Sequence, residues 1–343
     1  MSEPLPASGA RLALLLGGLG LLVLAVSLGA LFIGSARVPP GDVLAVLTGR
    51  RIKGFDQVVV LSLRLPRILV ALLAGGALAV AGAGFQALAR NPLAEPSVLG
   101  VSSGAAFGVI VAQVFGLGGS LVEAVGLAAC AFAGALVAGA AVYLIASRAG
   151  GLPVHTLLLA GVIVGIFFSS AITVLISVVD FDRLGGVVHW LLGNLSPIAP
   201  TSLAVFAALT ALGGWLVIGA ARRLNLLALG EESAQQLGVD AEGVKRRIFA
   251  GAALLTSAAV AFAGPIGFVG LIVPQTIRLL LGSDNRVVIP AALLGGGAFL
   301  LLADTVARNV IAPAELSVGV ITAFCGTPFF IYLLRVRAAD PHL

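Results

Sequence analysis

The chain has 343 residues, of which 59% are apolar or aromatic and only 10% are charged. A soluble domain carries charge on roughly a quarter of its residues, so this composition excludes an ordinary soluble protein. Ten membrane-spanning helices of ~20 residues need about 200 mostly apolar residues, which is close to what this chain supplies. We therefore expect one all-α integral membrane domain over residues 1–343, with no separate soluble domain.

Apolar runs bounded by charged residues, proline or glycine predict about ten spans. In chain order they are expected at residues 11–34, 66–89, 98–117, 121–147, 155–178, 200–221, 248–264, 267–281, 288–309 and 315–334. The first run exceeds the roughly 7–15 apolar residues of a signal peptide, so we expect it to be retained. An even number of spans places both termini on the same side of the membrane.

Basic residues support a cytoplasmic location for both termini. Under that orientation more Lys and Arg residues fall inside than outside, as the positive-inside rule requires. The exceptions are concentrated in residues 37–67, which invites a functional explanation. The net charge of +5 is thus better explained by orientation in the bilayer than by a nucleic-acid partner.

The first unusual cations are Arg64 and Arg67, at the start of the second span. Two guanidinium groups three residues apart can form bidentate bonds with carboxylates of an external protein or of a ligand. They can equally extend to lipid phosphates, and the spacing alone leaves both interpretations open.

A serine-hydrolase pattern, G-x-S-x-G, occurs at Gly100–Gly104. That motif needs a strand before it to expose the hydroxyl, whereas here an apolar run follows and no strand precedes. We expect a Gly/Ser-rich helix start instead, and a membrane enzyme using Ser102 is a minor alternative. No phosphate-binding G-x-x-x-x-G-K-[ST] motif occurs, so any ATP must be hydrolysed by another chain.

Small residues and prolines mark the interior of the predicted spans. Gly104–Gly108 and Gly161–Gly165 have the spacing that lets helices approach closely in lipid. Pro265 and Pro274 interrupt the span near 267–281, and broken helices tend to border cavities or moving parts. We expect tight packing at the glycines and a broken helix at the prolines.

Acidic and metal-ligating residues are sparse. Glu123, Asp304 and Glu315 lie near predicted span ends, where capping or a salt bridge is expected, which disfavours an ion-coupled carrier. The three histidines and two cysteines show no metal-ligand spacing, so no metal site is expected.

The longest polar stretch on the predicted cytoplasmic side is residues 224–247. Gly230 and Gly238 bracket about two helical turns, in which Ala234 and Leu237 are expected to share a face at i, i+3 spacing. We expect a short helix on the membrane surface. It is either a connector or a docking element for a cytoplasmic partner, because exposed leucines need a cover.

Taken together, these segments closely resemble the FecCD permease family of ATP-driven importers for iron chelates, haem and cobalamin. The match runs from about residue 60 to residue 335. The segments that carry it are residues 63–67, 82–88, 91–96, 99–105, 157–161, 190–193, 264–271 and 303–308.

The resemblance implies a type II ABC importer permease of ten helices in the bacterial inner membrane. It implies a homodimer with a central pathway, two ATPase subunits that use ATP and Mg, and a periplasmic substrate-binding protein. No cofactor is expected on this chain itself. Haem or a ferric siderophore is expected ahead of cobalamin, and ATP-driven movement of residues 224–247 is expected to switch the dimer between outward-open and inward-open states.

The resemblance also assigns roles to particular residues. Docking of the binding protein is implied for Arg64, Arg67 and Arg308. A cytoplasmic gate is implied for Asn91, Leu93, Val154, His155 and Thr156. ATPase coupling is implied for Leu229, Gly230, Glu231, Glu232, Ala234, Leu237 and Gly238. One departure is Gln275, where family members commonly carry a histidine.

Overall fold

The computed structural model describes residues 9–34, 36–50, 54–114, 121–147, 151–178, 181–193, 195–312 and 314–339, which form an all-α bundle. The helices are α1 (Gly9–Phe32), α2 (Pro40–Leu47), α3 (Phe55–Val58), the π-helix η1 (Val59–Arg64), α4 (Leu65–Ala89), the 3-10 helix η2 (Pro96–Leu99), α5 (Val101–Val114), α6 (Leu121–Ala146), α7 (Val154–Val178), α8 (Phe181–Leu191), α9 (Pro200–Ile218), α10 (Ala221–Leu227), α11 (Glu231–Gln236), α12 (Ala241–Ala263), α13 (Val269–Leu281), α14 (Asn285–Asn309) and α15 (Val318–Ala339).

A helix lies at each of the ten predicted span positions in the described residues. Seven helical segments are long and apolar enough to cross a membrane, and α5, α13 and α15 are shorter apolar helices. Two predicted starts were late. The second span begins at Phe55, because α3 and η1 run continuously into α4. Helix α12 begins at Ala241 because the Asp240 carboxylate caps it, accepting from Gly243 N at 2.9 Å.

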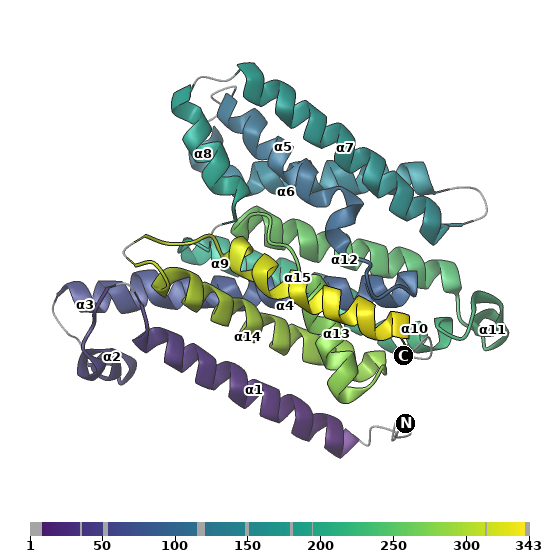
Figure 1. Cartoon of the computed structure of the whole chain (residues 1–343), viewed down its shortest axis with the longest axis horizontal. Coiled ribbons are helices and arrows are strands. Elements are labelled where there is room, and N and C mark those ends of the chain that lie inside the picture. The colour runs from purple at the N-terminus through teal and green to yellow at the C-terminus, as the bar shows by residue number, and fades with distance from the viewer. Residues whose placement is uncertain are drawn as a thin grey trace.

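Helix α4 forms the centre of the molecule (Figure 1). It packs against α14, α12, α13 and α9, while α5, α6, α7 and α8 form a layer on one side and α1 lies along α14 on the other. The start of α1 and the end of α15 lie at the same end as α10 and α11, and α2 and α3 lie at the opposite end. The first and last helices thus have their terminal ends on the same side of the bundle, as an even number of spans requires.

Close helix crossings depend on glycine, as the sequence predicted. A Cβ at Gly82 would collide with the Gly270 carbonyl, so α4 and α13 touch through backbone. Helices α5 and α6 cross in the same way where Gly104 meets Gly134. A Cβ at Gly161 would lie 2.5 Å from the Val98 carbonyl oxygen. Such contact replaces the hydrophobic effect as the source of packing energy in lipid.

The helix break predicted at Pro265 lies between α12 and α13, whereas Pro274 lies inside the continuous helix α13, so no break occurs there. Gly264 ends α12 at φ 71°, and Phe268 precedes α13 at φ 68°, a left-handed conformation that is uncommon for a residue with a bulky side chain. Glu95 stabilises this junction by accepting a hydrogen bond from Phe268 N at 3.2 Å, and burial raises the pKa of its carboxyl. Gly326 leaves room for the Phe268 ring against α15. The break fixes where the short helix α13 starts.

Candidate functional site

Two clusters of charged residues, one at each end of the bundle, each include part of the predicted functional residues. The first surrounds α11. Gly230 at φ 120° and Gly238 at φ 79° bracket this helix, so the expected short helix is present. Leu229 and Leu237 beside it are 66% and 60% exposed. A helix flanked by exposed leucines offers apolar surface to a partner.

One detail of the α11 prediction is wrong. Ala234 is fully buried, whereas Leu237 points outward, so the two side chains do not share a face. The reason is that α11 ends at Gln236, and Leu237 is its C-cap with φ −85° and ψ 10°. Helical i, i+3 geometry therefore does not extend to that position.

A buried lysine connects α11 to α12 through a salt bridge. Lys245 Nζ on α12 donates to Glu231 Oε2 at 2.8 Å and to Glu242 Oε1 at 2.7 Å. The second oxygen of Glu242 accepts from Leu152 N at 2.7 Å, just before α7 begins. Lys245 is 3% exposed, so both carboxylates are needed to offset the cost of burying its charge.

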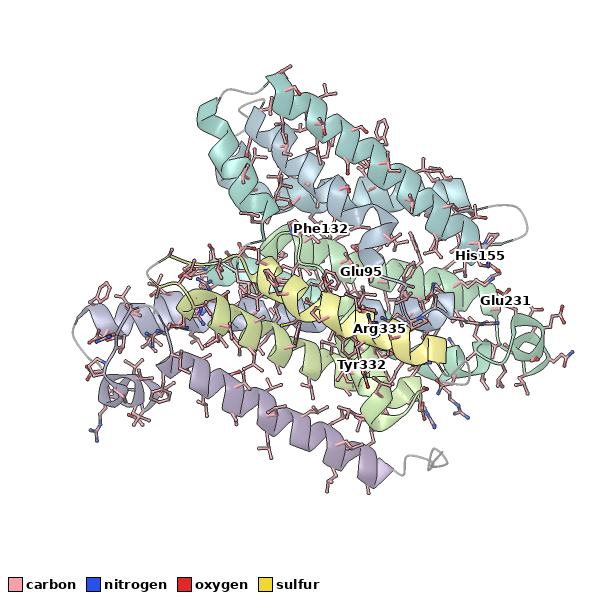
Figure 2. The ribbon with its side chains drawn as sticks, in the orientation of Figure 1. Glu95, Phe132, His155, Glu231, Tyr332 and Arg335 are labelled. Atoms are coloured by element: carbon pink, nitrogen blue, oxygen red, sulfur yellow. The ribbon has the colours of Figure 1, made fainter. Side chains whose placement is uncertain are left out.

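A pocket of about 680 Å³ lies beside this cluster. Its lining includes Asn91, Val154 and His155 from the predicted gate, together with Glu231 and Lys245. Figure 2 shows His155 and Glu231 at the same end of the molecule. The structure thus brings part of the predicted gate and part of the predicted coupling segment to one place, although they are far apart in the sequence.

The other two predicted gate residues are not among those that line this pocket. Leu93 is exposed and donates its backbone N–H to the Asn91 side chain at 2.9 Å, which forms the turn after α4. Thr156 follows His155 in the first turn of α7.

Helix α10, which precedes α11, forms hydrogen bonds with the loop between α13 and α14. Asn225 Nδ2 donates to Asp284 Oδ1 at 2.6 Å, and Asn225 Oδ1 accepts from Asn285 N at 2.9 Å. The hydrogen bonds from Arg286 lower the pKa of Asp284 to about 2. Asp284 is therefore ionised at any physiological pH, and the segment that carries α11 has a permanent anchor here.

The second cluster lies at the opposite end of the bundle. Asp304 on α14 is 1% exposed and accepts from Arg67 Nη2 at 2.8 Å. Arg308 Nε lies 3.0 Å from the other Asp304 oxygen, close enough for an ion pair but not aligned as a hydrogen bond. Arg67 also donates to Glu315 at 2.9 Å. The salt bridges expected for Asp304 and Glu315 are confirmed, and Glu123 has no described side chain.

The three predicted docking arginines are therefore bound within their own chain. Arg64 donates to the backbone carbonyls of Leu31 and Ala36 and is buried, so contact with lipid phosphate is the wrong interpretation for it. Arg67 is partly exposed, and its partner Glu315 is 42% exposed. An external acidic group can reach this cluster only at the Arg67–Glu315 edge.

Sequence reasoning missed Lys245, Glu242 and Asn225. The i, i+3 spacing of Glu242 and Lys245 was a visible signal for a local ion pair. Nothing in the sequence indicated that Leu152 or Glu231 would join that pair, because these contacts depend on how distant helices pack.

Alternative sites are weaker. Ser102 lies in the first turn of α5, after Gly100 at φ 71°, so the expected helix start replaces a nucleophile turn. Among the described residues, no three His, Cys, Asp or Glu side chains gather in a way that could hold a metal ion. Gln275 is buried on α13.

The fold is that of a polytopic helical membrane protein, and its sequence contains no phosphate-binding G-x-x-x-x-G-K-[ST] motif. The chain belongs to the FecCD transport family, whose model matches residues 21–336. It is the membrane-spanning permease component of an ABC transporter, and in this family the ATPase is a separate subunit.

Named relatives agree with this assignment. The cobalamin import system permease protein BtuC of Halobacterium salinarum is 44% identical over 281 residues, covering 82% of this chain and 74% of the relative. The hemin transport system permease protein HmuU of Yersinia pestis is 41% identical, covering 80% and 82%. A solved structure described as an inward-facing ABC transporter of the metal-chelate type superposes with a TM-score of 0.80 at 32% identity, covering 94% and 99%.

Proposed function

We propose that this chain translocates an iron chelate, haem or a ferric siderophore, from the periplasm to the cytoplasm by alternating access. It acts as a homodimer in the bacterial inner membrane with two ATPase subunits, and a periplasmic binding protein delivers the substrate. The observation that carries the proposal is the position of α11, which is flanked by two exposed leucines and lies beside the pocket lined by Asn91, Val154 and His155. A partner protein that binds α11 would therefore contact the permease next to the predicted gate.

The orientation follows from the same placement. If α11 meets an ATPase, its end of the bundle is cytoplasmic, and so are the start of α1 and the end of α15. The Arg67–Glu315 edge then faces the periplasm. An acidic side chain of the binding protein would compete there with Glu315 for the Arg67 guanidinium.

Cobalamin is the second candidate substrate, favoured by the relative from Halobacterium salinarum. Haem is favoured by the relative from Yersinia pestis. Both molecules are bulky metal chelates, so the same wide pathway would serve either one, and the binding protein would supply most of the selectivity.

The proposal is tested in proteoliposomes that contain the permease, the ATPase and the binding protein encoded with it. We expect ATP-dependent uptake of radiolabelled haem or ferric siderophore to exceed uptake of cobalamin. The reverse order would establish cobalamin as the substrate. Uptake by the permease alone under an ion gradient would contradict the proposal and support an ion-coupled carrier.

Partner binding at α11 has its own test. Replacing Leu229 and Leu237 by alanine should reduce co-purification of the ATPase at least tenfold, because both changes remove exposed apolar surface that a bound partner would bury. Thermal stability of the permease should not change, since both side chains are exposed. Leu14→Ala, on the lipid-facing side of α1, is the matched control. Full ATPase recovery with the double variant would reject the coupling role.

A further inference from the structure

We infer that Lys245 is a positioning residue that links movement of α11 to the first turn of α7, through Glu231 on one side and Glu242 on the other. The link joins the predicted coupling helix to the predicted gate. Its role in transport rests on the proposed function, whereas the physical link itself is a property of the isolated chain.

The first half of the link is the ion pair between α11 and α12. Glu231 is the first residue of α11, and its carboxylate is the only α11 group with a salt bridge among the described residues. The Lys245 ammonium, at 2.8 Å, has almost no exposure to water. A charge-assisted bond to a buried ammonium is stronger than a surface ion pair, so it can transmit force from this short helix.

The second half runs from α12 to α7. Glu242 uses one oxygen for Lys245 and the other for Leu152 N, each at 2.7 Å. Gly151 makes room for this arrangement, because a Cβ there would lie 2.5 Å from the Glu242 carboxyl carbon. Leu152 is buried and precedes Pro153, whose carbonyl accepts the hydrogen bond from Leu157 N that starts α7. The Glu242 carboxylate therefore holds the first turn of α7.

The buried ammonium makes the link nearly all-or-none. If α11 is displaced and takes Glu231 with it, Lys245 either follows or loses half of its compensating charge. Losing it leaves a buried ammonium with one counter-ion in place of two, which is the costlier outcome. The pocket of about 680 Å³, lined by Glu231, Glu242, Lys245 and His155, provides space for the shift. Displacement of α11 is therefore passed to the start of α7.

Hydrogen exchange in the isolated permease tests the physical link without any partner. Glu231→Gln should raise exchange of the peptide containing Leu152 and Leu157 roughly tenfold, the change expected for loss of ~1.4 kcal/mol from the link. Glu231 does not contact that peptide directly, so a purely local role for Glu231 would raise exchange in α11 alone. That local result would overturn the inference.

The matched control is Arg246→Gln. Arg246 is the next residue on α12, is exposed, and forms no ion pair among the described residues. Arg246→Gln removes one positive charge, as Lys245→Gln does, and breaks no hydrogen bond or salt bridge of the link, so it controls for the long-range effect of charge on Glu242. If Arg246→Gln increased hydrogen exchange at the start of α7 as much as Glu231→Gln does, the effect would be a general loosening of the structure. That result would overturn the inference. Lys245→Arg, which keeps donors for both carboxylates, should restore protection that Lys245→Gln loses.

The functional arm measures substrate moved per ATP hydrolysed in the reconstituted complex. Glu231→Gln should lower this ratio at least threefold, because ATP hydrolysed by the bound ATPase then no longer displaces the start of α7. An unchanged ratio would overturn the transport role. If wild-type complex shows no ATP-driven uptake, the proposed function fails, and the exchange experiment still decides whether the physical link exists.

Discussion

Each of the two charged clusters has one buried charged group that is shared by two groups of opposite charge. The sign of the buried charge differs between the clusters, and so do the elements that it connects. At one end, the buried carboxylate of Asp304 is shared by two arginines. At the other end, the buried ammonium of Lys245 is shared by two glutamates. The Asp304 cluster joins α4 to α14, two long helices packed along their length. The Lys245 cluster joins a helix of six residues to the bundle.

The difference shows that a shared charge can have two roles, depending on the other contacts between the elements that it connects. It acts as a staple where it joins helices that are already closely packed, and as a tether where it connects a short helix with few other contacts. Helices α4 and α14 also meet at the Gly75–Gly296 crossing, so removal of their ion pairs would not let them separate. Helix α11 has few such contacts. Movement is thus expected at the Lys245 end and rigidity at the Asp304 end.

The largest effect is expected from Asp304→Ala. This change leaves Arg67 and Arg308 without their shared buried counter-ion, which costs about 3–5 kcal/mol when one member of a buried pair is removed. We expect a lower melting temperature of the purified permease in detergent and reduced yield. A melting temperature equal to that of the wild type would show that the Asp304 cluster is not a staple.

A smaller loss of stability is expected from Lys245→Met. The two glutamates that remain are both partly exposed, so water can solvate them, and we expect a loss of roughly 1–3 kcal/mol. The measurement is the same thermal unfolding, compared directly with Asp304→Ala. A loss larger than that of Asp304→Ala would reverse the assignment of staple and tether.

Glu315→Gln should hardly change stability, because a partly exposed ion pair contributes only about 0–1 kcal/mol. It should instead raise the affinity of the binding protein severalfold, since Glu315 no longer competes for Arg67. Surface plasmon resonance with the permease in nanodiscs measures this change. A weaker affinity would indicate that Glu315 itself contacts the binding protein, and Asp56→Asn, a carboxylate near Arg64, is a charge-matched control.

The smallest effect is expected from pH at the Asp284 anchor. Its pKa is lowered to about 2, so its contribution is complete above its unfolded value of 3.8 and is lost as pH falls towards 2. The difference in melting temperature between wild type and Asp284→Asn should therefore stay constant from about pH 5 to pH 8 and shrink only below about pH 4. A difference that changes near pH 6 would contradict the role of Asp284.

Most of the bundle could be predicted because each span is a local property. A run of apolar residues long enough to cross the bilayer has to be helical to satisfy its own backbone, so the ten spans followed directly from the sequence. Glycines at four-residue spacing indicated the crossings, and Gly230 and Gly238 indicated α11. The errors also had local causes, such as the early start of α12 at the Asp240 cap and the C-cap position of Leu237.

Only the tertiary structure decided which charges meet. Arg67 and Asp304 are 237 residues apart in the chain, and Leu152 and Glu242 are 90 apart. Hydropathy and spacing report on neighbours along one helix, whereas these partners are set by the order in which helices pack. Sequence alone therefore identified the permease family and predicted where a coupling segment lies. Packing determined that Arg64, Arg67 and Arg308 bind within the chain and that a buried lysine connects α11 to the start of α7.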